Sequence, residues 1–489
     1  MTLKKRLSIR KPSAPKSRVF AHSMAANAAT VFDKLAFFVI SVITARYLGP
    51  AHFGEYTSAL AFATFFSIFA DMGSAEALVR SVSLEPESER SHFAAAIEMR
   101  LLLSAAAYGL LALALYFTGY NRNTAYLALV LGIARVGNVF LSGFYALFDA
   151  KERFFLSSFF NSSFSFTVLA GTICVVLLQY DYFALAWVRA VTAILYIAVV
   201  GALTLRYFRP RWKSADLASL FKTTLPFTLG TISGNISQNA TVPILSLLRG
   251  TTPAGLFTGG YLFFSSLFFI PSNLNRVLLP YLYRCPYPEE REKFQFAHDI
   301  YARLYAMLSF YIFIVLFFYS NDLVMLVFGG HYAASTGVLR ISAFGVPFVF
   351  TVAGAIIQAL DMQPVLARIQ AASAVFSLVA CLSLIPPFGA EGAAAAMVAA
   401  WALAFFAMYL FLYRKRYVRL YRTFMAYVKL GLITMGLYAL HITLLSRIHF
   451  LASFLVISAL YAVAVMSLLV TGDDIRVLRE TVGLKWARK

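Results

Sequence analysis

The fold of this chain can be read from residues 390–422, which have the sequence AEGAAAAMVAAWALAFFAMYLFLYRKRYVRLYR. Residues 390–413 form an apolar run, and a cluster of Lys and Arg residues begins only at Arg414. A helix of about 20 apolar residues crosses the hydrocarbon core of a bilayer. Such a helix also satisfies its own backbone hydrogen bonds, which lipid cannot do. The segment therefore predicts a membrane-spanning helix that ends at a basic loop.

The same pattern recurs along the whole sequence. Hydrophobic residues make up 60% of the chain and charged residues only 13%, whereas about a quarter of the residues of a soluble domain are charged. We therefore predict an all-α polytopic membrane protein with about 14 transmembrane helices. The expected spans are 21–46, 56–80, 93–117, 124–147, 155–178, 182–206, 220–248, 254–282, 300–320, 337–360, 364–385, 390–413, 424–446 and 449–471.

The net charge of +20 is concentrated in alternate gaps between these spans. The basic segments are residues 1–20, 206–213, 414–422 and 472–489, whereas the gaps between them hold few basic residues. Lys and Arg accumulate in cytoplasmic loops, so both termini are expected in the cytoplasm, with the chain in the cell (inner or plasma) membrane. Basic tracts beside spans serve topology and contact with anionic membrane lipids, which disfavours nucleic acid as a partner.

The sequence offers no catalytic or metal-binding motif. Cys174, Cys285 and Cys381 are isolated, so neither a disulfide framework nor a zinc site is expected. Walker A, G-x-S-x-G and H-E-x-x-H patterns are missing, and we expect a protein that is not an enzyme and has no cofactor. Without a nucleotide site, transport would be driven by an H⁺ or Na⁺ gradient or by the gradient of the substrate itself.

A short internal repeat suggests two related halves. Residues 48–57 (LGPAHFGEYT) and 249–258 (RGTTPAGLFT) each follow a span and place glycines at corresponding positions. Two parallel halves related by an axis along the membrane normal are a transporter architecture. We therefore expect six helices in residues 21–206, six in 220–413 and two more in 424–471, with basic tails at 1–20 and 472–489.

Several motifs resemble a known family of exporters. The order and spacing of these motifs are similar to those of polysaccharide transporters, the O-antigen-type flippases of the multidrug/oligosaccharidyl-lipid/polysaccharide exporter superfamily. The motifs are residues 45–50 (ARYLGP), 53–56 (FGEY), 70–73 (ADMG), Arg80, 225–226 (LP), 254–257 (AGLF), 270–271 (IP), 277–280 (VLLP), 326–332 (LVFGGHY) and 338–341 (VLRI).

The resemblance implies the fold and the substrate class. Members of the family move an undecaprenyl-diphosphate-linked oligosaccharide between leaflets, through a V-shaped cavity between two six-helix lobes. Implied partners are the polyprenyl-diphosphate-linked glycan, membrane lipids and a glycan polymerase or glycosyltransferases of the same pathway. One departure is that residues 235–239 (NISQN) lack the Ile-Asp pair that often follows Leu-Pro in the seventh span, so no role of that acid carries over.

Basic residues inside the spans are candidates for holding the diphosphate. A charge at mid-bilayer costs about 2.5–3.5 kcal/mol or more, so it is rarely accidental, and the planar fork of arginine suits phosphate. We expect Arg135 and Arg276, with Arg189 and Lys34, to line the cavity. The alternative is that these charges are structural. In that case the membrane–water interface is reached by the side chains of Arg276, Arg189 and Arg340, and Arg135 pairs with Asp33 or Asp71.

Asp33 and Asp71 are the acids of most interest. An intramembrane carboxylate can relay protons or sodium ions, and a structural pair with Arg135 or Lys34 is the equal alternative for both. Glu76 and Glu98 lie near the cytoplasmic boundary and are expected to be solvated.

The predicted seventh span is unusually polar. Asn235, Gln238 and Asn239 share one face of a helix and could bind sugar hydroxyl groups; the alternative is hydrogen bonding between helices, worth about 0.6 kcal/mol per bond. A short interfacial helix is expected at residues 323–328. The rival functions are a cation-coupled drug or small-molecule antiporter of the same superfamily and, in another class, a polytopic glycan polymerase or ligase.

Overall fold

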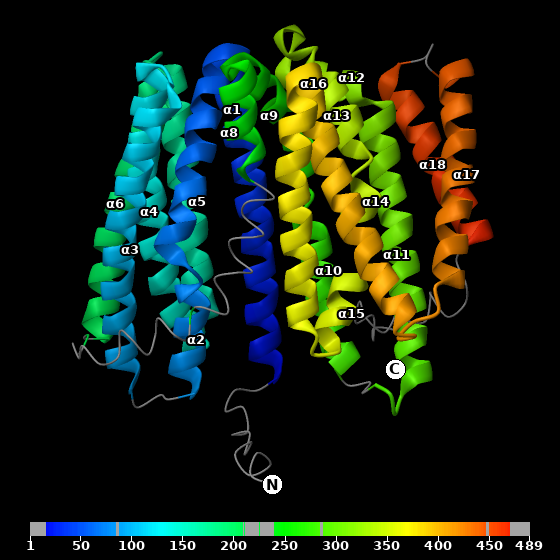
Figure 1. Cartoon of the computed structure of the whole chain (residues 1–489), viewed down its shortest axis with the longest axis horizontal. Helices are drawn as coiled ribbons and strands as arrows, with labels where there is room; N and C mark the ends of the chain where they lie inside the picture. The colour runs from blue at the N-terminus through cyan, green and yellow to red at the C-terminus, as the bar shows by residue number, and fades with distance from the viewer. Residues whose placement is uncertain are drawn as a thin grey trace.

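The computed structural model describes residues 16–84, 88–208, 210, 224, 239–283, 287–445 and 449–469, and these residues are helical or in loops. Nine of the described helices are long and apolar enough to cross a membrane, or up to ten if a bent pair is counted as one span. The helices stand side by side in Figure 1. The prediction of an all-α, multi-pass membrane protein is confirmed.

The first half of the chain closely follows the predicted spans. Its helices are α1 (Lys16–Asp71), α2 (Ser74–Leu84), α3 (Glu89–Thr118), α4 (Arg122–Ala150), α5 (Phe154–Leu177) and α6 (Phe183–Tyr207). Two expected spans meet within α1, which breaks at Gly49 (φ 66°, ψ 171°). Glycine adopts this backbone conformation without the steric penalty that a Cβ imposes. Met72 and Gly73, also with positive φ, separate α1 from α2.

The second half contains more interrupted helices. They are α8 (Thr241–Arg249), α9 (Thr251–Ser265), α10 (Phe269–Tyr283), α11 (Arg291–Phe318), α12 (Ser320–Phe328), η2 (Gly330–Tyr332), α13 (Ser335–Ala343), α14 (Val346–Val349), α15 (Ala353–Ala359) and α16 (Gln363–Arg414). The short helix expected at 323–328 is confirmed as part of α12. The final helices are α17 (Tyr421–Thr443) and α18 (Phe450–Leu468).

The uninterrupted span expected at 337–360 was wrong. The chain there bends by 41° between α13 and the segment Val346–Ala359, which is itself divided into α14 and α15. Pro347 lies in the first turn of α14, where a missing N–H is tolerated, but it cannot continue the preceding helix. The expected boundary between the halves, at 206–220, falls largely outside the described residues.

The repeated glycines cross each other where the two halves meet. Gly250 adopts φ 88° and ψ 174°, close to the values of Gly49. A Cβ on Gly54 would collide with the Thr251 carbonyl, and a Cβ on Gly255 would collide with the Pro50 carbonyl. The relationship expected from the sequence repeat is therefore present in the backbone as a reciprocal contact between α1 and α9.

This crossing lies at the upper end of the molecule in Figure 1, where side chains also join the halves. Arg46 donates from Nε to the Val327 carbonyl (2.5 Å) and from Nη2 to the Leu326 carbonyl (2.6 Å). Tyr332 donates to the Ala45 carbonyl at 2.9 Å. The contacts run from α1 to the C-terminal end of α12 and to η2, so the two halves are closed against each other at this end.

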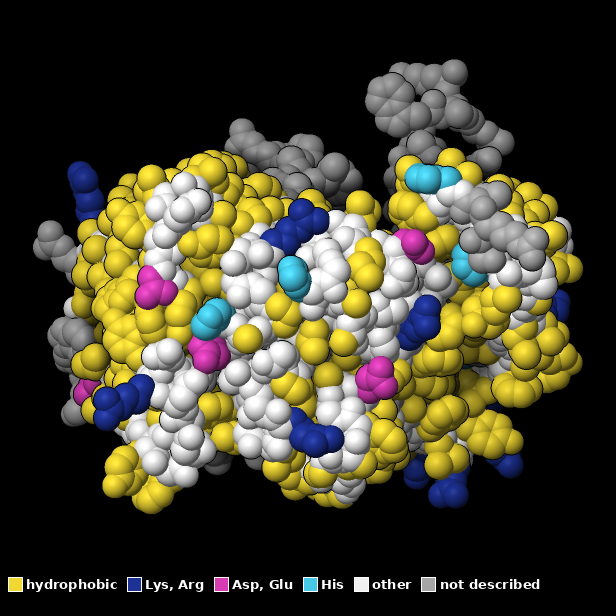
Figure 2. Space-filling model, turned by 90° about the horizontal axis from the view of Figure 1, so that it is seen from above, with side chains coloured by type: hydrophobic (Ala, Val, Ile, Leu, Met, Phe, Trp, Pro, Cys, Tyr) yellow, Lys and Arg dark blue, Asp and Glu magenta, His cyan; other side chains and the backbone are white. Residues whose placement is uncertain are grey.

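The two ends of the bundle differ in charge. Figure 2 shows the upper face with only scattered charged side chains and with hydrophobic side chains around its rim. The α4–α5 and α16–α17 junctions lie at the lower end in Figure 1, and the basic run 414–422 belongs to the α16–α17 junction. Of the basic segments, the run 414–422 is therefore placed by the described structure at the end opposite the α1–α9 crossing.

Candidate functional site

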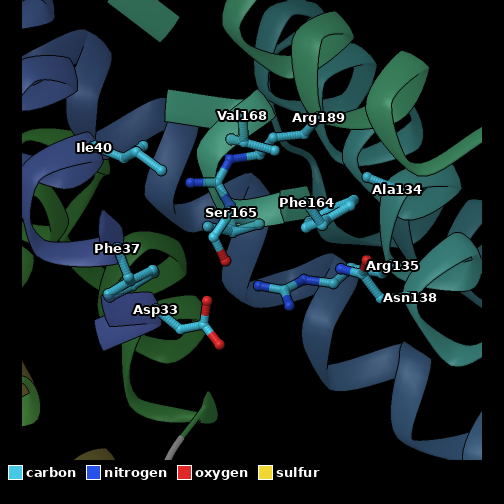
Figure 3. Close-up of a pocket in the computed structure, with 11 residues that line it drawn as sticks. Asp33, Phe37, Ile40, Ala134, Arg135, Asn138, Phe164, Ser165, Val168 and Arg189 are labelled. Atoms are coloured by element: carbon cyan, nitrogen blue, oxygen red, sulfur yellow. The ribbon is translucent and has the colours of Figure 1, made fainter. Parts of the chain in front are cut away.

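A cavity of about 120 Å³ lies inside the first half of the molecule, between α1, α4, α5 and α6. Most of its wall is apolar, but two arginines and one carboxylate reach it (Figure 3). The lining residues are Asp33, Phe37, Ile40, Leu60, Ala134, Arg135, Asn138, Phe164, Ser165, Val168 and Arg189.

Small residues on α4 bring its neighbours close and position Arg135. A Cβ on Gly132 would meet the Tyr108 ring of α3 at 3.0 Å, and one on Gly137 would meet the Ala193 Cβ of α6 at 2.8 Å. Glycine permits such close helix approach because no side chain intervenes. Arg135 lies between these two contact points, and Figure 3 shows its side chain extending into the cavity.

Arg135 and Arg189 carry charges that nearby acids do not neutralise. Among the described residues, neither arginine has a carboxylate within ion-pair distance, and the buried Nε of Arg135 has no hydrogen-bond partner. The two guanidinium groups are close enough to repel each other. Arg189 lies over the ring of Tyr56 at 5.9 Å from its centroid, a contact that partly compensates a cation. The site therefore favours an anion.

Asp33 enters the same cavity from α1, on the side opposite Arg135 (Figure 3). Its Oδ2 accepts a hydrogen bond from Asn161 of α5, and its buried Oδ1 has no partner among the described residues. The alternative of a direct Asp33–Arg135 ion pair is not formed in this structure. Lys34, one residue further along α1, is exposed and does not line the cavity.

Asp71 pairs with Arg100 of α3, so the expected alternative partners, Arg135 and Lys34, were wrong. Arg100 Nη2 and Asp71 Oδ1 are 3.0 Å apart, and the Arg100 side chain is 1% exposed. Ser74 accepts from Arg100 Nε at 2.8 Å and donates to Asp71 at 3.1 Å. Gly143 leaves the space that the guanidinium fills. This network stabilises the break between α1 and α2, outside the cavity.

Sequence reasoning missed Arg100, although a usable signal was present. Arg100 lies within the expected span 93–117, and a charge inside a span indicates a partner or a function. Arg340, which did attract attention, is exposed and donates from Nε to Ser320 at 2.7 Å.

The other expected site residues are not brought to this cavity by the described structure. Asn235 and Gln238 lie outside the described residues, as does the side chain of Arg276. Asn239 is helical and part-buried, just before α8. In the described ranges, no group of three or more His, Cys, Asp and Glu residues could hold a metal ion.

The described part of the second half contains a stack of aromatic side chains around Trp401. Trp401 of α16 stacks on Phe264 with ring centroids 4.7 Å apart and on Tyr261 at 6.4 Å. Phe257 continues the stack at 5.4 Å from Tyr261. Offset and stacked aromatic pairs add about 0.5–1.5 kcal/mol each beyond their burial, so this region is a packed structural core.

A larger apolar pocket of about 630 Å³ lies between α11, α14, α16 and α17. Most of its lining residues are aromatic, and it contains no charged side chain. They are Phe310, Phe313, Phe344, Pro347, Phe348, Phe405, Phe406, Tyr409, Leu420, Thr423, Phe424, Tyr427, Gly431, Thr434 and Met435. Hydrocarbon is the ligand chemistry that such a wall accommodates.

Comparisons with known proteins agree with this architecture. The sequence model of a family described as "Polysaccharide biosynthesis protein" matches residues 22–285. No match was found among curated proteins.

Solved structures share the fold at low sequence identity. The lipid II flippase MurJ in an inward closed conformation has a TM-score of 0.74 and 13% identity, over 95% of this chain and 99% of that one. An inward-facing multidrug resistance MATE transporter of the MOP superfamily has a TM-score of 0.61 and 14% identity, over 78% of this chain and 94% of that one. A MOP superfamily transporter from Pyrococcus furiosus, described as having a binding pocket of reverse polarity, has a TM-score of 0.57 and 12% identity, with 82% and 95% covered.

Proposed function

This chain belongs to the polysaccharide biosynthesis protein family, and from that membership we propose that it is a flippase for a polyprenyl-diphosphate-linked oligosaccharide. The substrate moves from the cytoplasmic to the outer leaflet for the synthesis of a cell-surface polysaccharide. The fold similarity to a lipid II flippase supports this proposal at the level of the scaffold. Glycosyltransferases would supply the substrate and a glycan polymerase would consume it.

The cationic cavity is the observation that carries the proposal. A diphosphate is an anion that must leave water to cross the bilayer, and this step is costly unless the charge is paired. Arg135 and Arg189 present guanidinium groups that lack carboxylate partners among the described residues. Arginine donates paired hydrogen bonds to phosphate and keeps its charge, so these two side chains would hold the diphosphate.

The small volume of this cavity supports a role in holding the diphosphate and not the glycan. At about 30 Å³ for each water molecule, its roughly 120 Å³ accommodates a compact anion and excludes a glycan. The glycan would lie between the halves, where Lys34, Arg276, Asn235, Gln238 and Asn239 remain candidate contacts. The apolar pocket beside α17 would hold part of the polyprenyl tail.

The two ends of the molecule suggest a direction of transport. The halves are joined at the upper end through Arg46 and the Gly54–Gly255 crossing. The basic loops at the lower end favour a cytoplasmic position for that end. Alternating access would open the upper end to release the substrate, and a cation bound at Asp33 would couple the step to an H⁺ or Na⁺ gradient.

The charge of the cavity argues against the rival transporter. A cation-coupled drug antiporter would need a binding site that favours cationic molecules, whereas two arginines and one carboxylate reach this cavity. A glycan polymerase or ligase would instead need a catalytic set.

The test is leaflet transfer in proteoliposomes that contain a polyprenyl-diphosphate oligosaccharide. We expect transfer by the wild type and a loss of about 100-fold or more in Arg135→Gln/Arg189→Gln, because the variant removes at least two hydrogen bonds to a charged group and each contributes about 1.5–3 kcal/mol. The control is Arg122→Gln, which removes an exposed arginine from the first turn of α4.

The outcomes separate the function from the site. An absence of transfer by a folded wild-type protein rejects the flippase proposal. Transfer at the wild-type rate by the double variant rejects the arginine pair as the diphosphate site.

A further inference from the structure

A second charged pocket, which we call the lower-end basic pocket, lies between α11, α17 and α18. It has a volume of about 400 Å³ and combines basic and apolar side chains. Its lining residues are Phe296, Asp299, Ile300, Arg303, Tyr421, Arg422, Met425, Ala426, Lys429, Leu468 and Leu469. The pocket lies far along the chain from the cavity of the first half, and the flippase proposal does not use it.

The pocket continues into a hollow of about 790 Å³ beside the start of α17. The two share Phe296, Asp299, Tyr421 and Arg422, and the hollow adds Arg291, Lys293 and Arg419 as further basic residues and Glu292 as a further acid. Among the lining residues that the structure describes, basic side chains therefore outnumber acidic ones across both spaces. An excess of positive charge at the end of a span attracts anionic lipid head groups.

Lys293 is paired with Glu290 at 3.0 Å, whereas two other basic residues of the group contact backbone carbonyl groups. Lys429 Nζ donates to the Leu468 carbonyl at 3.4 Å, and Arg291 Nη2 donates to the Arg416 carbonyl at 3.0 Å. A backbone carbonyl accepts a hydrogen bond but carries no net charge. Asp299 is 3.6 Å from Arg422, whose side chain is 73% exposed. Among the described residues, Lys429 has no acid within ion-pair distance, so an anion that reaches both Arg422 and Lys429 would add charge compensation.

Asp299 and the loop before α17 are held in place by Gln295. Its Nε2 donates to Asp299 Oδ1 at 2.7 Å and to the Arg419 carbonyl at 3.0 Å, and its Oε1 accepts from the Arg419 N–H at 2.7 Å. A fixed loop presents its basic side chains at low entropic cost, which favours binding. The pocket is therefore preorganised by α11.

The position of Lys429 indicates what kind of anion fits. Lys429 lies eight residues after the start of α17, about 12 Å along the helix axis, and it is exposed. Exposed apolar side chains surround it, including Tyr421 (72%) and Leu468 (55%). A cation among lipid-facing residues at this depth needs a partner at the head-group level.

We propose that the lower-end basic pocket binds the phosphate group of an anionic phospholipid. Arg422 and Lys429, seven residues apart on one face of α17, hold the phosphate, and the acyl chains follow the exposed apolar side chains. The bound lipid fastens the α17–α18 pair to α11. The ligand is a resident membrane lipid and carries no glycan.

The experiment uses native mass spectrometry of the purified full-length protein. The probes are phosphatidylglycerol, phosphatidylcholine and inorganic phosphate. We expect retention of phosphatidylglycerol over phosphatidylcholine, and a loss of about tenfold or more in Arg422→Gln/Lys429→Gln, since each basic residue near the surface contributes to anionic lipid binding. The matched control, Arg122→Gln/Arg249→Gln, removes two exposed arginines from the other end of the bundle.

Several results would overturn the proposal. These are equal retention of the two phospholipids, unchanged retention in the double variant, and binding of inorganic phosphate as tight as that of the lipid. Asp473 and Asp474 follow α18 in sequence. Lipid binding that appears only in Asp473→Asn/Asp474→Asn would show that these two carboxylates, and not a lipid, neutralise the pocket in the wild type.

A folding control keeps the test decisive. The single variant Lys429→Gln removes an exposed side chain and is expected to keep the fold. Loss of selective lipid retention with an unchanged thermal unfolding midpoint supports the site. The experiment measures lipid binding and not transfer of the substrate. Its outcome therefore tests the lower-end basic pocket independently of the flippase proposal.

Discussion

The two halves of the molecule share a backbone device but differ in what fills their interiors. Gly54 and Gly255 occupy matching positions in the repeat and pack against each other. At the same offset in sequence, Leu60 lines the cationic cavity of the first half, whereas Tyr261 stacks on Trp401 in the second. Both copies of the repeat therefore supply the same glycine contact, whereas the side chains in the interiors of the two halves differ.

This difference shows that a pseudo-symmetric scaffold can support an asymmetric site. The crossing helices need small residues at the same two positions, because their backbones touch there. The interior positions are free to differ, since each faces only its own half. In the proposed function, the half with Arg135 and Arg189 binds the anion, and the half with the aromatic stack contributes a packed core.

The largest expected effect concerns the buried charge of the first half. Asp71→Ala leaves the Arg100 guanidinium buried without its acid, and a broken buried pair costs about 3–5 kcal/mol. We expect a loss of this size in the free energy of unfolding, measured by thermal or denaturant unfolding in detergent. Asp71→Asn should lose less because it keeps a hydrogen-bond acceptor.

The control for this variant is Glu289→Ala, an exposed acid in the turn before α11. If Asp71→Ala and Glu289→Ala unfold alike, the Arg100–Asp71 pair is not a stabilising feature of the first half.

The next effect tests what the halves share. Gly54→Ala and Gly255→Ala each force a methyl group against a backbone carbonyl of the opposite helix, and such overpacking costs about 1–3 kcal/mol. Because the contact is reciprocal, the two variants should lose similar stability by thermal unfolding. Gly109→Ala, where a Cβ meets nothing within 4 Å, should be neutral or slightly stabilising. Unequal losses of stability in the two variants would show that the two glycine contacts are not equivalent.

Much of the fold could be predicted because the bilayer constrains it. Span length and the placement of Lys and Arg are physical requirements, and the expected spans 93–117 and 124–147 lie within α3 and α4. The break between α13 and α15 could not be predicted, since an apolar run has the same composition whether or not it bends. Only Pro347 offered a local signal.

The candidate site was predictable only in part. The cost of a charge in the membrane pointed to Arg135 and Arg189, and the structure brings these side chains to one cavity. The partner of Asp71 could not be deduced, because pairing depends on which helices pack together. Lys34 follows Asp33 on a helix, and adjacent residues point about 100° apart, so proximity in sequence did not place it in the cavity.

A reciprocal exchange sharpens the comparison of the interiors. Leu60→Tyr should fill the cavity beside the two arginines and lower transfer of the lipid-linked substrate, while keeping the fold. Tyr261→Leu should remove aromatic contacts worth about 0.5–1.5 kcal/mol each and lower the unfolding temperature, with little effect on substrate binding. Transfer assays and thermal unfolding of both variants check this. A Tyr261→Leu variant that loses binding as strongly as Leu60→Tyr would show that the second half contributes to the anion site.

The smallest expected effect concerns the hydrogen bonds by which Arg46 joins the two halves at the upper end. Arg46 donates two hydrogen bonds from α1 to carbonyls at the end of α12, and each contributes about 0.5–1.5 kcal/mol. Arg46→Gln should shift the population towards molecules open at the upper end, by about tenfold for each 1.4 kcal/mol lost, without changing overall stability. Spin-label distances between the two halves at that end would measure the shift. The same distance distribution in the wild type and the variant would mean that the contact between Gly54 and Gly255 is enough to close the upper end without the hydrogen bonds of Arg46.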